Sequence, residues 1–572
     1  MTGVGQVQHE RDNHASARMP DGDAPSRVAR ELSPSRYADP FARLRLPPAD
    51  QWPQLEFDLP SLVYPDELNC ADALLKDAIR QAGPGSPAII TDAETWTYAD
   101  LLAAANRYAR VLTEDLGLRS GGRVLLRGGN TPALFACWLA VVKAGGIAVT
   151  TMPLLRAAEL SQIVRKAEAD LALCDVRLAG ELTACAGGGA PTRVVLFGTP
   201  DAELDGRAAR KPAEFTAAPA SQDDVCLIAF TSGTTGQPKA ALHFHRDVMS
   251  MCHTYAAHRL PRGERPVFCG TPPIGFTFGL GALLAFPLFF GAAVVLPSES
   301  APGALADAIR RHRVTHVFTS PTGYRAMLEA PGPLDLSSLQ VAVSAGEHLP
   351  TATSEAWFQA TGLRLLDGIG ATEMIHIFIS SDPDDVRPGS VGKPVPGYTV
   401  ALLDDDGQPV EGEGAGRLAV RGPVGCRYLN DPRQGDYVQH GWNLTGDMFR
   451  RDADGFYWFV ARADDMIISS GYNIAGPEVE GAILSHRDVA ECVVVGAPDA
   501  RRGQVVKAYV VLKPDAAPAP ETAKALQDHV KAILAPYKYP RLVEFVAELP
   551  RTTTGKLSRR ALRDAATAGD RS

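Results

Sequence analysis

Short β-branched runs alternate with helical patterns over the first two thirds of the chain. From residue 85 onward, PAIIT, RVLLRG and IAVTTMP are each followed by a stretch with apolar residues at helical spacing, such as YADLLAAANRYARVL and PALFACWLAVVKA. The rhythm continues through VCLIAF, THVFTSP, VAVSAG and LRLLDGIG. This alternation predicts an α/β fold in which helices cover mostly parallel sheets.

The pattern changes twice toward the C-terminus. After about residue 395, closely spaced strands with turn signals, such as AGRLAVRG and DGFYWFV, indicate a β-rich subdomain. Beyond a boundary at 461–465, we expect a helix to begin at Gly476-Pro477-Glu478, where proline suits the first helical position, and another to span 520–535. The predicted organisation is a leader over 1–45, a large domain over 46–460, a hinge over 461–465 and a small α+β domain over 466–572.

Composition narrows the class of protein. Of 572 residues, 45% are hydrophobic and 22% charged, which is typical of a globular protein with a sizeable core. The net charge of −9 argues against nucleic-acid or anionic-membrane binding. Residues 1–45 are rich in Arg, Asp, Ser and Pro without periodicity, so we expect them to be disordered. Without an apolar signal segment or a C-x-x-C pair, the chain is expected to be cytoplasmic with reduced thiols.

Two features invite other interpretations. Residues 266–298 carry no charge, but their prolines and glycines break any long helix, so we expect buried core and no membrane span. His243 and His245 lie two residues apart, but the sequence shows no third ligand at metal spacing, and a zinc site is not expected.

The most informative segment is TSGTTGQPK, residues 231–239, which follows the strand-like run VCLIAF and precedes a stretch predicted as helical from Leu242. Hydroxyls and glycines in such a turn supply donors and close backbone approach for phosphate oxygens. The segment therefore predicts a phosphate loop, although it lacks the G-x-x-x-x-G-K-[ST] pattern.

This loop resembles the signature loop of the adenylate-forming superfamily of acyl-CoA synthetases, peptide-synthetase adenylation domains and luciferases. Further segments agree in order and spacing: Gly370-Ala-Thr-Glu373, Thr445-Gly-Asp447, Arg462-Ala-Asp-Asp465 and Thr554-Gly-Lys556. The resemblance covers residues of about 60 to 562. Ala240 departs from it, because family members commonly have glycine after the loop lysine.

The resemblance implies roles for nucleotide-binding residues. Those expected to hold the β- and γ-phosphates of ATP are Thr231, Ser232, Gly233, Thr234, Thr235, Gly236 and Lys239. Those expected around the adenine and ribose are Glu347, Asp367, Ile369, Asp447 and Arg462. Asp367 would accept from the adenine amino group, and Ile369 would give apolar contact where the family commonly stacks an aromatic ring.

The resemblance also implies the catalytic groups. A carboxylate attacking the α-phosphate brings two anions together, so the site must supply positive charge. Lys556 would bridge the two anions, Thr372 would contact the α-phosphate, and Glu373 would bind Mg²⁺. The small domain would then swing about Asp464 and present the face of Gly471 to the thiol.

Other segments indicate the class of acid. SAGEHLP and GIGATEMIHIF resemble the benzoate-CoA ligase branch, and LPPADQWPQL, LNCADALL, HFHRDVM and TPPIGFTFGLG are most similar to 2-aminobenzoate-CoA ligases. By position, the residues expected at the aromatic ring are Phe276, Thr277, Phe278, Ala345, Gly370, His376 and Ile377.

The sequence thus predicts a ligase that uses ATP, Mg²⁺ and coenzyme A to activate 2-aminobenzoate. Salicylate or another benzoate remains an alternative acid, and a carrier-protein phosphopantetheine remains an alternative acceptor. A luciferase-like oxygenase and a silent nucleotide-binding protein are less favoured, the latter because Lys239, Glu373, Asp447 and Lys556 are all present. A homodimer also stays open.

Overall fold

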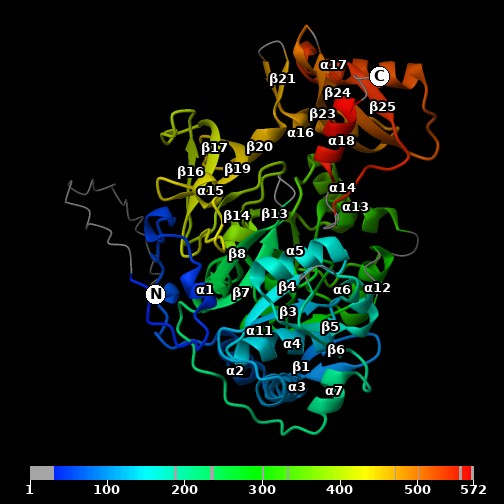
Figure 1. The fold of residues 1–572 in the computed structure, drawn as a ribbon. Coiled ribbons are helices and arrows are strands. Elements are labelled where there is room, and N and C mark those ends of the chain that lie inside the picture. The colour runs from blue at the N-terminus through cyan, green and yellow to red at the C-terminus, as the bar shows by residue number, and fades with distance from the viewer. Residues whose placement is uncertain are drawn as a thin grey trace, which may run out of the picture. The chain divides into compact units, whose positions relative to one another are not determined.

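The structure is a computed structural model that describes residues 31–185, 190–231, 237–298, 302–330, 334–469, 472–499, 501–552 and 557–568. By its contacts the chain divides into Met1–Leu32 and Ser33–Ser572, and the described helices and strands all belong to the second unit (Figure 1). The prediction of an α/β fold is confirmed, because two large sheets are built mainly of parallel strands, and helices alternate with these strands along the sequence.

The largest sheet has parallel strands in its middle and antiparallel strands at its edges. In spatial order its strands are β15 (Lys393–Pro394), β14 (Ile377–Ser380), β13 (Leu365–Gly370), β12 (Val341–Ala345), β11 (His316–Thr319), β9 (Val267–Gly270), β10 (Ala293–Val295), β1 (Pro87–Ile90) and β2 (Thr95–Thr97). Parallel strands end at the same edge of a sheet, so the segments after β12 and β13 are neighbours. The register places Ala345 opposite Gly368.

The second sheet carries the predicted phosphate loop. In spatial order its strands are β6 (Arg193–Phe197), β5 (Leu171–Asp175), β3 (Arg123–Arg127), β4 (Ile147–Thr151), β7 (Val225–Thr231) and β8 (Lys239–Phe244). The prediction of a helix from Leu242 is wrong, because β8 runs antiparallel to β7 and the helix begins at His245. Pairing with β8 satisfies backbone groups along β7 that would otherwise lack partners.

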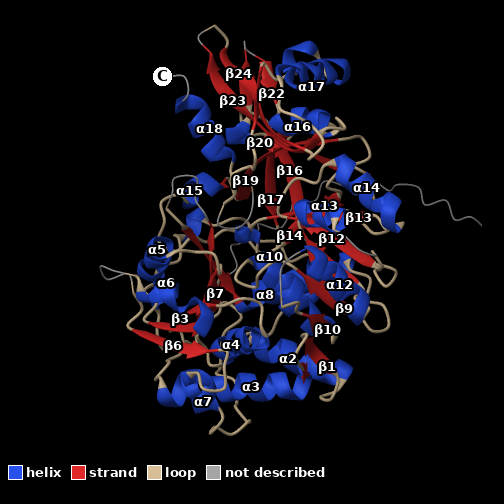
Figure 2. Cartoon of the chain, turned by 90° about the vertical axis from the view of Figure 1, so that its right-hand side faces the viewer, coloured by secondary structure: helices blue, strands red, loops and turns tan. Residues whose placement is uncertain are grey.

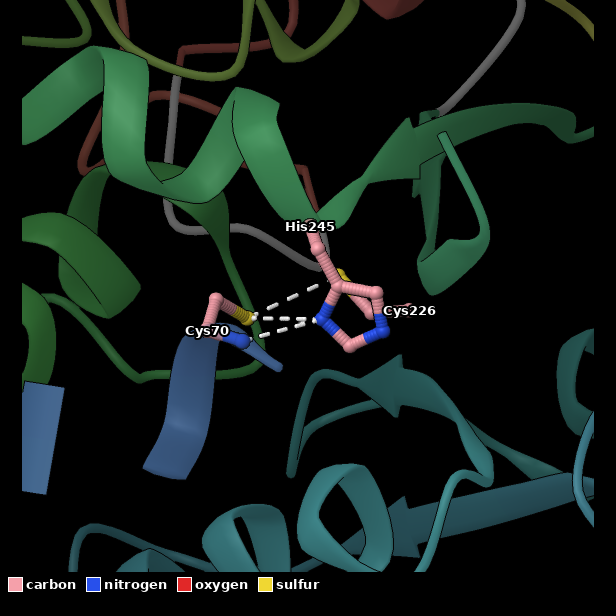
Figure 3. Close-up of side chains that lie close together, drawn as sticks. All are labelled: Cys70, Cys226 and His245. Atoms are coloured by element: carbon pink, nitrogen blue, oxygen red, sulfur yellow. Dashed lines mark hydrogen bonds between the residues drawn. The ribbon is translucent and has the colours of Figure 1, made fainter. Parts of the chain in front are cut away.

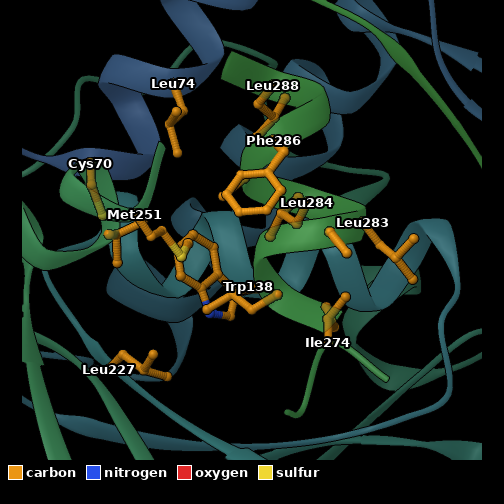
Figure 4. Close-up of a cluster of buried hydrophobic side chains, with 14 of the residues drawn as sticks. Cys70, Leu74, Trp138, Leu227, Met251, Ile274, Leu283, Leu284, Phe286 and Leu288 are labelled. Atoms are coloured by element: carbon orange, nitrogen blue, oxygen red, sulfur yellow. The ribbon is translucent and has the colours of Figure 1, made fainter. Parts of the chain in front are cut away.

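The helices, many of which connect the strands, are α1 (Phe41–Leu44), α2 (Cys70–Ala82), α3 (Tyr98–Arg110), α4 (Pro132–Lys143), α5 (Ala157–Ala167), α6 (Ala179–Thr183), α7 (Glu203–Ala208), α8 (His245–Met251), α9 (Ala257–Arg259), α10 (Thr277–Gly279), α11 (Phe286–Phe290), α12 (Pro302–His312), α13 (Pro321–Glu329), α14 (Thr351–Thr361), α15 (Gln434–Tyr437), α16 (Gly476–Leu484), α17 (Pro520–Ile533) and α18 (Arg559–Ala568). Helix α4 is apolar on all sides and is correspondingly buried along its length. Figure 4 shows its Trp138 among side chains such as Met251, Leu284 and Phe286.

Residues 266–298 form part of this core. They fold as β9, a Gly/Pro loop, the helical stretch 277–290 and β10, as the breaks in the sequence predict. Most of these side chains are buried. No helix within the described ranges is both long enough and apolar enough to cross a membrane.

The C-terminal part also follows the predicted pattern, with the β-rich subdomain and the small α+β domain both present (Figure 2). The strands of the first are β16 (Thr399–Leu403), β17 (Gly414–Arg421), β18 (Val438–Gln439), β19 (Trp442–Arg451) and β20 (Tyr457–Arg462). Those of the second are β21 (Ile467–Ser469), β22 (Tyr472–Ile474), β23 (Val489–Asp499), β24 (Gly503–Leu512) and β25 (Leu542–Phe545). The helices expected at Gly476 and over 520–535 are α16 and α17.

The expected disorder of residues 1–45 is wrong for residues 33–45, which we call the N-terminal strap. The Ser33 amide donates to Asp223 Oδ2 at 2.8 Å, and the Tyr37 hydroxyl lies 2.8 Å from His245 Nε2. Phe41 is buried, and the Arg123 guanidinium lies 4.1 Å from its ring centroid. The polar composition of the N-terminal strap is typical of disorder, but residues far away in the sequence order this segment by contacting it. Residues 1–30 lie outside the described part.

Candidate active site

A cavity of about 950 Å³ lies at the edge where β12 and β13 end. Its lining joins the ends of these strands to β19, β20 and the small domain. Of the residues predicted to bind nucleotide or acid, it is lined by Glu347, Asp367, Ile369, Gly370, Asp447 and Arg462. The structure thus brings residues 347 to 462, which are distant in sequence, to one cavity.

Asp367 lies on β13 and is largely buried. Burial raises the pKa of its carboxyl to about 7, against a smaller opposing effect of the Gly368 backbone. Ile369, two residues on, packs against the core. Glu347 accepts a hydrogen bond from the Thr322 hydroxyl at 2.8 Å. The Asp367 carboxyl and the Ile369 side chain therefore line the same cavity. Together they offer a hydrogen-bond acceptor for an amino group and an apolar surface for a flat ring.

Asp447 and Arg462 pair across strands β19 and β20. The Arg462 guanidinium donates to Asp447 Oδ1 at 3.2 Å and to the Thr445 carbonyl at 3.0 Å. A carboxylate held in this way is well placed to accept hydrogen bonds from a sugar diol. The two residues that the sequence assigned to ribose are therefore direct neighbours.

The two ends of the predicted phosphate loop meet, because Thr231 ends β7 and is paired with Lys239, which begins β8. Ser232, Gly233, Thr234, Thr235 and Gly236 lie outside the described residues. Beyond the loop, Arg433 donates to the carbonyls of Gln237 at 3.0 Å and Pro238 at 3.5 Å. Arg433 thus fixes the backbone just before Lys239, a role the sequence did not suggest.

Thr372 and Glu373 begin a single 3₁₀ turn, Thr372–Met374, which is labelled η7. The His243 imidazole donates from Nε2 to the Thr372 carbonyl at 2.8 Å. The Tyr428 hydroxyl donates to Glu373 Oε1. Burial, and then the charge of Glu373, raise the pKa of Tyr428, so the phenol stays protonated and acts as the donor.

Sequence reasoning considered His243 only as a metal ligand and did not identify Tyr428. A helical interpretation from Leu242 conceals that Lys239 and His243 lie on the same face of strand β8, since side chains alternate along a strand. Tyr428 carries no local signal, because its contact with residue 373 depends on the tertiary fold.

The predicted ring pocket is only partly assembled around the cavity. Gly370 lines it, whereas Thr277, Ala345, His376 and Ile377 are buried and are not among its lining residues. A Cβ on Gly370 would lie 2.6 Å from the His376 carbonyl oxygen, so glycine allows the two segments to touch. Phe276 immediately precedes α10, which begins at Thr277.

His376 is enclosed by aromatic rings. Its ring centroid lies 4.7 Å from that of Phe286, 5.1 Å from Tyr255 and 5.7 Å from Phe278. Neither ring nitrogen makes a well-formed hydrogen bond among the described residues, and a weaker interaction with the Phe278 backbone only partly opposes the effect of burial on its pKa. Burial lowers the pKa of His376 to about 3, so the imidazole is neutral at physiological pH.

The remaining predicted residues belong to the small domain and to the predicted hinge before it. Asp464 lies in the short turn Ala463–Asp465 between β20 and β21, and its side chain is outside the description. Gly471 and Lys556 lie outside the described residues. Thr552 and Leu557, which flank the segment of Lys556, both line the cavity.

Cys70, Cys226 and His245 form a group of potential metal ligands (Figure 3), and none of the three lines this cavity. Both imidazole nitrogens already have partners: Nδ1 accepts from the Cys70 amide at 3.1 Å, and Nε2 lies 2.8 Å from the Tyr37 hydroxyl. The described residues supply three ligands, whereas a closed zinc site has four. We interpret the group as a buried hydrogen-bond cluster that anchors the N-terminal strap.

Comparison with known proteins adds to this geometry. The profile of the AMP-binding enzyme family matches residues 75–428, and that of the AMP-binding enzyme C-terminal domain matches residues 478–556. A benzoate–CoA ligase of Thauera aromatica is 36% identical over 521 residues, covering 88% of this chain and 98% of that relative. A 3-hydroxybenzoate–CoA ligase of Aromatoleum sp. (strain CIB) is 34% identical, with the same shares covered. The crystal structure of the anthranilate CoA ligase AuaEII in complex with anthranoyl-AMP superposes with a TM-score of 0.85 at 33% identity, over 90% of this chain and all of that one.

Proposed function

We propose that the acid activated by this protein is 2-aminobenzoate and that the thiol is coenzyme A. The chain belongs to the AMP-binding enzyme family and is an acid–thiol ligase. In the first step a carboxylate oxygen attacks the α-phosphorus of ATP, and the bond to pyrophosphate breaks. In the second, the CoA sulfur attacks the acyl carbon of the adenylate, loses its proton and displaces AMP.

The nucleotide is proposed to lie along the cavity edge. Asp367 and Ile369 would contact adenine, and Asp447 with Arg462 would take the ribose hydroxyls. Lys239, beside the phosphate loop, would neutralise the β- and γ-phosphates. All of these side chains except Lys239 line the cavity.

Glu373 is proposed as the protein ligand of Mg²⁺, which would supply positive charge to the triphosphate. The donor fits, because Mg²⁺ prefers one or two carboxylates together with phosphate oxygens. The Tyr428 hydroxyl engages one carboxylate oxygen, Oε1, and so fixes its orientation.

Lys556 is proposed to stabilise the charge that develops as the carboxylate meets the α-phosphate. Thr552 and Leu557, the described residues on either side of Lys556, both line the cavity. Rotation about Asp464 would then withdraw Lys556 and bring the Gly471 face to the thiol, so that one site serves both steps.

The environment of His376 is the observation that carries the choice of acid. A neutral, buried imidazole has one ring nitrogen that can accept from an N–H donor, and neither nitrogen of His376 makes a well-formed hydrogen bond among the described residues. The rings around it favour a flat substrate over a flexible chain. The 2-amino group of 2-aminobenzoate is such a donor, which benzoate lacks. The complex of the structural neighbour with anthranoyl-AMP supports the same acid, and the names of the relatives support CoA as the acceptor.

The test is AMP release with single acids, each with and without CoA, in the wild type and in His376→Leu. Losing one hydrogen bond of about 1–2 kcal/mol predicts a roughly 5- to 30-fold fall in the kcat/KM ratio of 2-aminobenzoate to benzoate. An unchanged ratio would remove His376 from recognition of the amino group. Pyrophosphate release without an aryl-CoA product would instead move the acceptor to a carrier protein.

A further inference from the structure

Tyr428 contacts two oppositely charged groups of the proposed phosphate site. Its side chain is fully buried. The hydroxyl donates to Glu373 Oε1, and the Lys239 ammonium lies 5.1 Å from the centre of the ring. One uncharged side chain therefore touches both an anion and a cation.

Within the described part of the chain, Lys239 and Glu373 form no ion pair with each other, although both adjoin Tyr428. Opposite charges in a poorly solvated site attract strongly, and a direct pair would engage the groups that phosphate and metal require. The tyrosine offers each group partial compensation, with a hydrogen bond for the carboxylate and a π-face for the ammonium. The carboxylate of Glu373 and the ammonium of Lys239 can therefore each still bind a ligand.

Tyr428 is itself held firmly. Its amide donates to Gln434 Oε1 at 2.9 Å, and the Gln434 amide nitrogen donates in turn to the carbonyl of Gln51 at 2.9 Å. The backbone bridges to Ala241 of β8, and the ring packs edge-on against Tyr437 at 5.9 Å. A side chain fixed from several sides can fix what it touches.

The turn that carries Glu373 depends on such support. The turn ends at Met374 and is followed by Ile375, whose φ is +63°, a region that β-branched residues rarely adopt. Strained backbone persists when its surroundings hold it in place. His243 holds the backbone at the Thr372 carbonyl, and Tyr428 holds the side chain of Glu373.

From these contacts we infer that Tyr428 is a positioning residue, which keeps Glu373 and Lys239 apart and oriented toward the divalent ion and the triphosphate. The inference rests on the proposed function, which assigns those ligands to the two residues. Without the hydroxyl, Glu373 is free to turn toward Lys239, and both groups are lost to the ligand.

The variant Tyr428→Phe removes the hydroxyl and keeps the ring. The matched control is Tyr437→Phe, which keeps the ring that packs against Tyr428 and removes a buried hydroxyl that has no hydrogen-bond partner among the described residues. Binding of Mn²⁺·ATP is followed by electron paramagnetic resonance, and the Mg²⁺ dependence of AMP release is measured in parallel. Thioester formation from supplied aryl-adenylate and CoA reports a step that does not use the triphosphate.

We expect Tyr428→Phe to weaken Mn²⁺·ATP binding and raise the half-saturating Mg²⁺ concentration roughly 10- to 100-fold, as for other groups that orient metal ligands. Thioester formation should stay within about twofold, and the control should match the wild type. Mn²⁺·ATP binding within twofold of wild type, or equal losses in both half-reactions, would overturn the inference.

A second variant covers the case in which Tyr428→Phe does not fold. Gln434→Met loosens the backbone of Tyr428 without touching Glu373 or Lys239, and it should weaken Mn²⁺·ATP binding in the same direction by a smaller factor. Wild-type binding in this variant would count against the inference. Because Mn²⁺·ATP binding needs no acid, this result is independent of whether any benzoate proves to be a substrate.

Discussion

Replacing Asp367 by asparagine should stabilise the free enzyme at alkaline pH. Burial raises the pKa of this carboxyl from 3.8 to about 7. Its native pKa lies above its unfolded pKa, so the native state binds more protons between these values, and stability is lost as pH rises through this range. Asparagine resembles the protonated carboxyl in shape and has no charge to desolvate.

The size of the effect follows from the two pKa values. The desolvation penalty grows from about 2 kcal/mol at pH 5 to about 4 kcal/mol at pH 8, which is the upper limit of what Asp367→Asn can recover. With an unfolding entropy of about 2.1 cal/mol/K per residue, a unit of roughly 400 residues gains about 1 °C in Tm per kcal/mol. The variant should therefore melt up to about 4 °C above the wild type at pH 8 and up to about 2 °C above it at pH 5.

Differential scanning fluorimetry of both proteins from pH 5 to pH 8 measures this difference. Asp405→Asn is the control, because Asp405 is exposed and its replacement should leave the pH profile unchanged. A Tm gain that is absent, or that does not grow with pH, would refute the assignment of a buried, costly carboxylate at this position. The same variant should bind ATP more weakly if Asp367 accepts from the adenine amino group.

Two further predictions concern Lys556, the proposed catalytic lysine, and the proposed ring pocket. Lys556→Ala should reduce adenylate formation by orders of magnitude while sparing thioester formation from supplied adenylate. Single-turnover assays measure the two half-reactions separately, and equal losses in both would contradict the role assigned to Lys556. Gly281→Ala should raise the KM for the aromatic acid but not for ATP, because the new Cβ would lie 2.5 Å from the His376 ring and displace it. Steady-state kinetics with each substrate varied in turn would detect this change. An unchanged KM for the acid would argue that His376 does not form the pocket wall.

Local patterns were sufficient for much of the fold. The alternation of β-branched runs with helical stretches correctly predicts the parallel strands, because each element must bury one face whatever its neighbours are. Proline at the start of α16 and the breaks within 266–298 are also local signals, and the structure agrees with both.

The predictions from the sequence are wrong where contacts with residues distant in the sequence determine the local structure. Residues 239–244 form a strand because the edge of β7 is available, although the segment itself is compatible with a helix. Likewise, the polar N-terminal strap is ordered by Asp223, His245 and Arg123, which the leader sequence does not reveal.

The candidate site shows the same division. Motifs identify Asp367, Asp447 and Arg462, and the structure brings them to one cavity. Tyr428 and His243 act on the Thr372–Glu373 turn only through tertiary contacts, so no motif marks them. Their importance could be recognised only from the hydrogen bonds they make.

The most direct test of the proposed activity is a competition. The enzyme is incubated with ATP, Mg²⁺, CoA and equimolar benzoate, 2-aminobenzoate and 2-hydroxybenzoate, and the thioesters are identified by mass spectrometry. The account predicts 2-aminobenzoyl-CoA as the main product, formed together with AMP. A preference for benzoyl-CoA or 2-hydroxybenzoyl-CoA, or the absence of any aryl-CoA, would contradict it.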